Sequence, residues 1–363
     1  MLVLPRRGCA QNSELPKTLL DTACRGGYFR SAMAEPIDAL RWIFLNKKDE
    51  ARCGWRIAAF LLAFIVSGIL FGGLITAVAR LIPALGYLAV EPSPSGEFVS
   101  GHELAYLASD KLITLIATIS ATAFCAVLLE RRTFSSIGFK LHPGWLRDLA
   151  VGSLVGSVAL ACAVGIVMLK HAADFQLRSD RAFSLVVSLG FSLLFMFVAA
   201  ATEELLFRGF VFQALAYDLG PVVAVLGTSI LFGVLHIPNP NSTLFSTINT
   251  ILAGIWLGIA YLKTRSLWFA TGLHFSWNFV QASIFGLPVS GLTVLQKMSL
   301  LQGSSGEPRW LTGLDYGPEG GLAATLTLAA STVLILRADW LRVTEEMKLA
   351  TRHGARYSMP SIS

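Results

Sequence analysis

Two adjacent carboxylates, Glu203 and Glu204, lie in a stretch of the chain that otherwise carries almost no charge. The apolar run before them, residues 183–201, is long enough to enter a membrane. An ionised carboxylate at the centre of a membrane helix costs about 2.5–3.5 kcal/mol on insertion scales, so such a group is paired, hydrated or functional. These two residues are therefore the first candidates for chemistry.

The spacing of neighbouring residues separates the roles of the two carboxylates. Glu204 and Arg208 are four positions apart, so on a helix they share a face and can form an ion pair. We expect this pair to support the site by holding its neighbour in place. Glu203 is turned by about 100° from Glu204, and the residues three and four positions away from it are alanine, leucine and phenylalanine. Glu203 therefore needs a partner from another helix.

Two of the six histidines, His236 and His274, lie in apolar runs and can supply that partner. Asn278 follows His274 by four residues, so both side chains project from one helical face. Polar groups within a membrane span face the interior of the bundle or a water-filled cavity. We therefore expect Glu203, His236, His274 and Asn278 to face one another.

The depth of these residues in the membrane gives a geometric check. Glu203 lies 17 residues before Gly220 and His236 lies 16 residues after it, so a turn at 218–221 puts both at one depth, where they can share a water or a metal. His274 lies nine residues after Arg265, which makes it nominally shallower by about 10 Å at 1.5 Å per residue. Helix tilt, a kink at Gly209, or a fourth helix that protrudes toward the cytoplasm would close this difference.

The composition indicates an all-α, polytopic membrane protein. Of 363 residues, 54% are hydrophobic and 14% are charged, whereas about 25% are charged in soluble proteins. Several continuous apolar runs of about 20 residues favour membrane helices over a large soluble helical protein and over a β-barrel. The net charge of +6 does not point to nucleic acid, because the basic residues cluster beside the apolar runs.

The apolar runs predict about eight transmembrane helices. They cover residues 57–78, 104–129, 149–169, 183–201 with a continuation to 217, 222–236, 244–262, 267–285 and 321–336. With eight helices and both termini cytoplasmic, every basic cluster lies on the cytoplasmic side, as the positive-inside rule requires.

This division gives five regions of the chain. They are a polar N-terminal extension (1–55) that is disordered or partly amphipathic, the first three spans (56–182), a catalytic core (183–287), an outer loop with the last span (288–336), and a charged cytoplasmic tail (337–363). Met33 is an alternative start of the chain. The lipid bilayer is one expected partner.

Three motifs within the core resemble those of one known family. The run Glu203–Arg208 resembles the EExxxR motif of the CPBP family, Phe232–His236 resembles its FxxxH motif, and His274–Asn278 resembles its HxxxN motif. This family comprises the type II CAAX prenyl endopeptidases and the bacteriocin-processing or immunity proteins, also called Abi proteins. The resemblance covers roughly residues 183–285.

The resemblance implies an intramembrane endopeptidase that acts on a membrane-embedded or membrane-anchored peptide. Glu203 and His236 would activate a water as general base, His274 and Asn278 would stabilise the oxyanion, and Glu204 with Arg208 would support them. Family members are commonly called metalloproteases, and Glu203, His236 and His274 are candidate ligands for one zinc ion. The HExxH signature is absent, and catalysis without a metal is slightly favoured.

Other interpretations of the same residues remain. A lone histidine in a membrane helix often only hydrogen-bonds to a neighbouring helix, and a glutamate pair also suits a proton-coupled transporter. The alternative is therefore a transporter, or an immunity or scaffold protein that retains the motifs without proteolysis. We expect the protein in the cell membrane of a prokaryote.

Overall fold

The computed structural model describes residues 43–46, 50–82, 103–178 and 182–351. The chain divides into two units, residues 1–52 and 53–363. In the described part of the first unit, Leu45 pairs with Ala51 in an isolated bridge. Met33, most of the N-terminal extension and the last twelve residues lie outside the described ranges. The second unit carries the candidate site.

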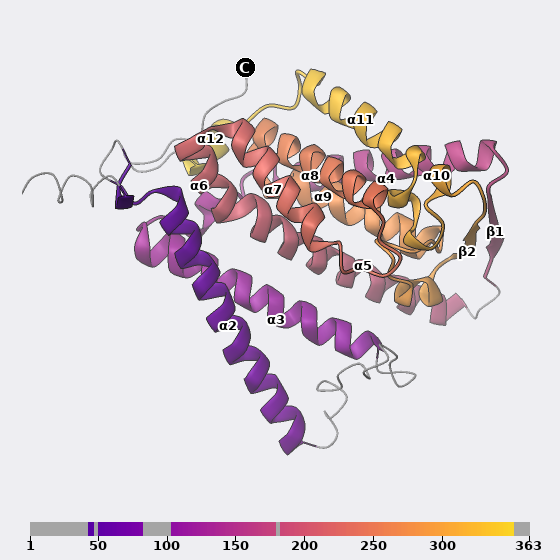
Figure 1. Ribbon diagram of the computed structural model, residues 1–363, viewed down its shortest axis with the longest axis horizontal. Helices are drawn as coiled ribbons and strands as arrows, with labels where there is room; N and C mark the ends of the chain where they lie inside the picture. The colour runs from indigo at the N-terminus through magenta and orange to yellow at the C-terminus, as the bar shows by residue number, and fades with distance from the viewer. Residues whose placement is uncertain (1–42, 47–49, 83–102, 179–181, 352–363) are drawn as a thin grey trace, which may run out of the picture. The chain divides into compact units, whose positions relative to one another are not determined.

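The second unit is mostly helical, so the all-α prediction is confirmed. Its main helices are α2 (Cys53–Leu81), α3 (Glu103–Ala123), α4 (Trp145–Leu169), α5 (Ala182–Glu204), α6 (Phe210–Leu219), α7 (Pro221–Leu235), α8 (Leu244–Thr264), α9 (Leu267–Phe279) and α11 (Leu322–Arg337). The shorter helices are α10 (Arg309–Thr312) and α12 (Glu345–Thr351). Helix α9 packs against α4, α5 and α8, and α8 packs against α7 and α11 (Figure 1).

Five helical segments within the described ranges are long and apolar enough to cross a membrane. They are Cys53–Leu81, Ala105–Leu129, Trp145–Met168, Leu185–Leu219 and Leu244–Thr264, and two shorter apolar helices cover Pro221–Leu235 and Leu322–Arg337. The protein is therefore an integral membrane protein. The count of eight spans and the cytoplasmic position of both termini stay predictions.

The predicted helix that carries Glu203 continues well beyond the carboxylate pair. Helix α5 ends at Glu204, a π-helical segment covers Leu205–Gly209, and α6 continues the same path to Leu219. The chain then turns at Gly220, whose φ is 93°, and α7 begins with Pro221. Glycine tolerates this left-handed conformation and proline suits the first helical position, so the predicted turn is confirmed.

The close packing of α4 on α9 depends on glycine. A Cβ atom added at Gly152 would lie 2.3 Å from the carbonyl oxygen of Phe269, and one added at Gly156 would lie 2.3 Å from that of Leu273. On the facing helix, a Cβ at Gly272 would lie 2.4 Å from the oxygen of Leu149. Small residues let membrane helices approach to backbone contact, so this contact fixes the position of α9.

Two loops of the sequence-based prediction pair as a small sheet. Strand β1 (Ala173–Leu177) is antiparallel to β2 (Leu301–Ser305), with Phe175 opposite Gly303. Both stretches lie between the spans predicted from the sequence. The pairing joins segments more than 120 residues apart, and neither stretch carries a strong strand pattern of its own, because strand formation depends on the partner.

A buried polar network fixes the relative heights of α6, α8 and α9. The side-chain amide of Gln213 on α6 donates to the carbonyl oxygens of Ser136 and Ile137, at 3.1 and 3.0 Å, and lies 2.7 Å from the Tyr261 hydroxyl on α8. The backbone N–H of Leu267, the first residue of α9, donates to the oxygen of Gly138 in the same turn. Gln213 and Leu267 therefore lie at one level.

We predict that Gly152→Leu destabilises the protein by at least about 1–3 kcal/mol, the usual cost of overpacking, because the new side chain meets the backbone of α9. The matched control is Gly165→Leu on the same helix, where an added Cβ finds nothing within 4 Å. Thermal unfolding of both purified variants in detergent measures the difference. Equal midpoints for the two variants would show that the α4–α9 contact is not the constraint proposed.

Candidate functional site

The candidate site is a cavity of about 340 Å³ within the helical bundle. All four residues predicted to face one another line it: Glu203, His236, His274 and Asn278. They come from α5, the end of α7, and α9. Most of the remaining lining is apolar; it includes Leu107, Phe195, Met196, Leu206, Phe207, Leu235, Trp256, Trp277 and Leu295. The cavity therefore offers a few polar groups in an apolar enclosure, as is typical of ligand sites.

Glu204 is completely buried and forms the ion pair expected from its spacing. Its Oε1 lies 3.1 Å from Nη1 of Arg208, which is also completely buried. Arg208 Nη2 donates to the carbonyl oxygen of Gly254 on α8 at 3.0 Å. The guanidinium also lies 4.9 Å from the ring centroid of Phe232 on α7. The pair therefore connects the end of α5 with α7 and α8.

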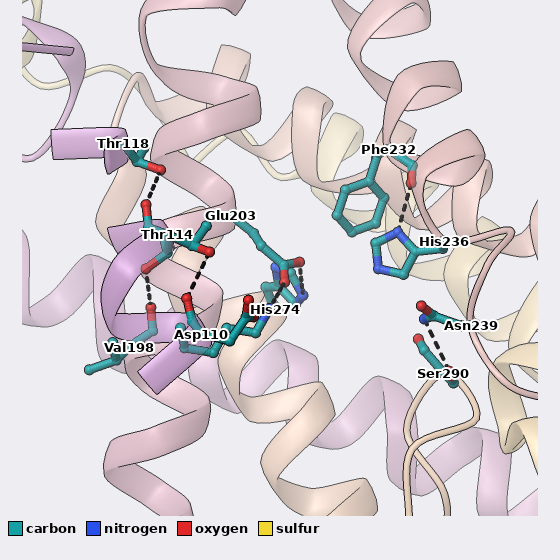
Figure 2. A network of polar contacts seen from close by, with 12 residues as sticks. Asp110, Thr114, Thr118, Val198, Glu203, Phe232, His236, Asn239, His274 and Ser290 are labelled. Carbon is teal, nitrogen blue, oxygen red and sulfur yellow. Dashed lines mark hydrogen bonds and ion pairs between the residues drawn. The ribbon is translucent and has the colours of Figure 1, made fainter. Parts of the chain in front are cut away.

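Glu204 also has a partner that the spacing along one helix did not predict. Its Oε1 lies 2.8 Å from Nδ1 of His274, whose Nε2 lies 3.7 Å from Oε2 of Glu203. His274 is thus placed between the two adjacent carboxylates, and Figure 2 shows its ring beside Glu203. Glu204 does more than neutralise Arg208, because it also fixes the orientation of the His274 ring.

The predicted difference in depth between Glu203 and His274 does not occur. Gln213 lies ten residues after Glu203, and its side chain donates to the carbonyl oxygen of Ile137. Leu267 lies seven residues before His274, and its backbone N–H donates to the oxygen of the adjacent Gly138. The last turns of α6, up to Leu219, extend beyond that level. Two of the three explanations open from sequence therefore have support: the helical path of Glu203 extends beyond that level, and the backbone of Gly209, with ψ of −123°, departs from helical geometry.

His236 lies across the cavity from Glu203 and His274 (Figure 2). Its Nδ1 lies 2.7 Å from the carbonyl oxygen of Phe232 one turn earlier, and its ring contacts the Phe232 ring at 4.5 Å between centroids. Donation from Nδ1 to this carbonyl leaves the lone pair on Nε2. The structure thus brings His236 to the same cavity that Glu203 lines.

Lys111 is a cavity residue that sequence analysis did not single out. Its Nζ lies 3.4 Å from Oε1 of Glu203, with the side chains 29% and 21% exposed. The two oxygens of Glu203 therefore face different partners, Lys111 on α3 and His274 on α9. A lysine within the apolar run 104–129 was the available signal, since charges in membrane spans are usually functional.

Glu319 is a second residue that sequence analysis missed. Its Oε2 accepts hydrogen bonds from Nε2 of Gln281 at 2.7 Å and from the backbone N–H of Ser290 at 3.1 Å. Burial raises the pKa of this carboxyl group to about 7, although those hydrogen bonds act in the opposite direction. Asn239, beside His236, donates to the oxygen of Ser290. These contacts hold residues 286–320 as one wall of the cavity.

The binding of a metal by the three candidate zinc ligands stays a prediction. In the part of the chain that the structure describes, no three histidine, cysteine, aspartate or glutamate side chains are grouped to hold a metal ion. His236 lies across the cavity, and the carboxylate of Glu203 faces the ammonium of Lys111. A positive charge at that distance opposes a second cation on the same carboxylate.

One known family matches the segment that builds this cavity. Residues 185–280 match the family described as type II CAAX prenyl endopeptidase, Rce1-like. The match contains all six residues predicted for the site, so the resemblance inferred from the motifs is confirmed for this segment. The matched segment is 96 of the 363 residues. Comparison with curated proteins gave no match.

We predict that Arg208→Met lowers stability by about 3–5 kcal/mol, because it leaves the Glu204 carboxylate buried with only His274 as a partner. The matched control is Arg309→Met, which removes an exposed arginine. The yield of folded protein and its thermal midpoint in detergent measure the effect. Normal yield combined with lost activity would instead place Arg208 in the reaction itself.

Proposed function

We propose that the protein is an intramembrane endopeptidase in which Glu203 is the general base for a water molecule. The observation that carries this proposal is the cavity itself. A glutamate, two histidines and an asparagine from three helices line one apolar enclosure, within the segment that matches the protease family. Hydrolysis requires a base, a positioned water and hydrogen-bond donors for the oxyanion. Side chains of these types can act as the base, orient the water and donate to the oxyanion.

The cavity that Glu203 and His236 both line suits the attacking water. If the Nδ1–H group of His236 donates to the Phe232 carbonyl oxygen, Nε2 of His236 can accept one hydrogen bond from that water. Glu203 accepts the other hydrogen bond of the water. Glu203 removes a proton as the water oxygen attacks the carbonyl carbon of the peptide. The same proton then passes to the leaving amine when the carbon–nitrogen bond breaks. We thus assign His236 to the orientation of the water.

His274 and Asn278 are the proposed donors to the oxyanion. Both line the cavity from one face of α9, one turn apart. Glu204 holds the His274 ring through Nδ1, which directs Nε2 toward the cavity, and donation to the oxyanion requires a proton on Nε2. Preorganised donors in a site that excludes water are worth about 2.7–4 kcal/mol each in other hydrolases. Glu204 and Arg208 are therefore positioning residues.

The name of the matched family supports a proposal for the substrate class. We propose a prenylated peptide of CAAX type, or another membrane-anchored peptide, as the substrate. The apolar lining, with phenylalanine and tryptophan side chains around the polar groups, suits a chain that arrives from the lipid. We propose the cell membrane of a prokaryote as the location.

We predict that Glu203→Gln lowers the rate of peptide hydrolysis about 10²–10⁴-fold, the usual contribution of a general base, while the protein remains folded. The glutamine keeps the shape of the side chain but cannot take the proton. The control is Glu346→Gln, which changes an exposed glutamate on α12. Cleavage of a prenylated peptide by purified protein is measured by mass spectrometry. Full activity in Glu203→Gln and in His236→Ala would favour the non-proteolytic alternative.

We also predict that hydrolysis persists after exhaustive treatment with a metal chelator. The ammonium of Lys111 at Glu203 supports a reaction that needs no metal, because it already neutralises the carboxylate. Activity and zinc content are measured on the same treated sample. Activity that disappears on treatment and returns with added Zn²⁺ would contradict this prediction and favour the zinc set.

A further inference from the structure

The ion pair between Lys111 and Glu203 carries an inference that rests on the proposed function. Lys111 lies on α3, and the cavity wall there also includes Leu107 and Thr114, one turn to either side. Among the described residues that line the cavity, Lys111 is the one lysine or arginine. Helix α3 lies outside the segment 185–280 that matches the family. Lys111 therefore belongs to none of the three motifs.

The ion pair conflicts with the role of Glu203 as a base. The ammonium lies 3.4 Å from Oε1 of Glu203, so one of the two oxygens that could receive a proton from the water already has a cationic partner. A lysine in an apolar span requires a counterion, and without substrate Glu203 is that counterion. A reactive complex therefore needs a second anion in the cavity. This anion pairs with the ammonium of Lys111 and releases the carboxylate of Glu203.

We infer that Lys111 binds the free C-terminal carboxylate of the substrate, and that Glu203 holds the ammonium only until this carboxylate arrives. A peptide cut close to its end brings one negative charge into the cavity. An extended peptide spans about 3.3–3.6 Å per residue, so two or three residues beyond the cut place the carboxylate roughly 7–11 Å from the reacting carbon. The flexible four-carbon stem of lysine can follow it.

The chemistry of the site favours a carboxylate over a lipid phosphate. Lysine presents one compact charge, whereas phosphate recognition commonly uses several donors or the fork of arginine. The other ionisable groups that line the cavity are Glu203, Glu319 and the two histidines. The single ammonium group of Lys111 can neutralise one negative charge, and the C-terminal carboxylate of a peptide carries one such charge.

The experiment compares two forms of one peptide on the full-length protein in zwitterionic nanodiscs. The peptide carries a prenylated cysteine followed by three residues, and it ends either in a free acid or in an amide. We expect wild type to prefer the acid about tenfold in kcat/KM, the effect of one charge-assisted hydrogen bond. Lys111→Met should bring the acid-to-amide ratio close to one, and Lys111→Arg should keep most of the preference.

A binding measurement separates this inference from the proposed function. Glu203→Gln should bind the acid peptide more tightly than wild type does, because the competing carboxylate is gone, and its affinity for the amide should change less. The double variant Glu203→Gln with Lys111→Met should lose that discrimination. Lys170→Met, which removes an exposed lysine after α4, is the matched control and should keep the wild-type acid-to-amide ratio.

Three results would overturn the inference. The first is an equal preference for the acid in wild type and in Lys111→Met. The second is equal binding of acid and amide by Glu203→Gln. The third is a cleavage rate that rises when anionic phospholipid is added to the nanodiscs, equally for the acid and the amide peptide, in wild type but not in Lys111→Met. This result would assign the anion that binds Lys111 to a lipid headgroup. If no peptide is cleaved in a Glu203-dependent way, the proposed function fails, and the binding measurement still decides the role of Lys111.

Discussion

The burial of the Glu204 carboxylate is the constraint on which the rest of this structure depends. Its Oε1 is shared between Arg208 on its own helical path and His274 on α9, and Arg208 continues the contact to the backbone of α8. Inside an apolar bundle each of these polar groups needs the others, because water is not available to replace a lost partner. Because the buried carboxylate of Glu204 needs these partners, α5, α8 and α9 are held together around the cavity.

The change from α- to π-helical geometry begins directly after this acid. The segment Leu205–Gly209 carries Arg208, and beyond it α6 extends to the network of Gln213. Single π-helical turns within α-helices are found frequently at functional sites. Here the turn lies between the carboxylates of the site and the polar network that sets the level of α9. The same continuous helix therefore serves both the chemistry and the alignment of its neighbours.

The sequence allowed the helices and the identity of the cavity residues to be predicted, because both depend on local pattern. Apolar runs define helices, and polar residues within them must face inward, as Glu203, His236 and His274 do. The contact of His274 with Glu204 and the pairing of β1 with β2 could not be predicted, since they depend on how distant segments pack. Lys111 was visible in its apolar run, but its partner on α5 was not.

The contribution of α3 to the cavity has a consequence for how such a protein diversifies. The side chains proposed for hydrolysis lie on α5 to α9, while one wall, with Leu107, Lys111 and Thr114, comes from a helix outside the matched segment. Under the proposed function, mutations in this wall would change the surroundings of a bound peptide without touching the buried network of Glu204. Reaction chemistry and substrate choice would then be encoded in separate stretches of the gene, so that selection could act on one while the other is held constant.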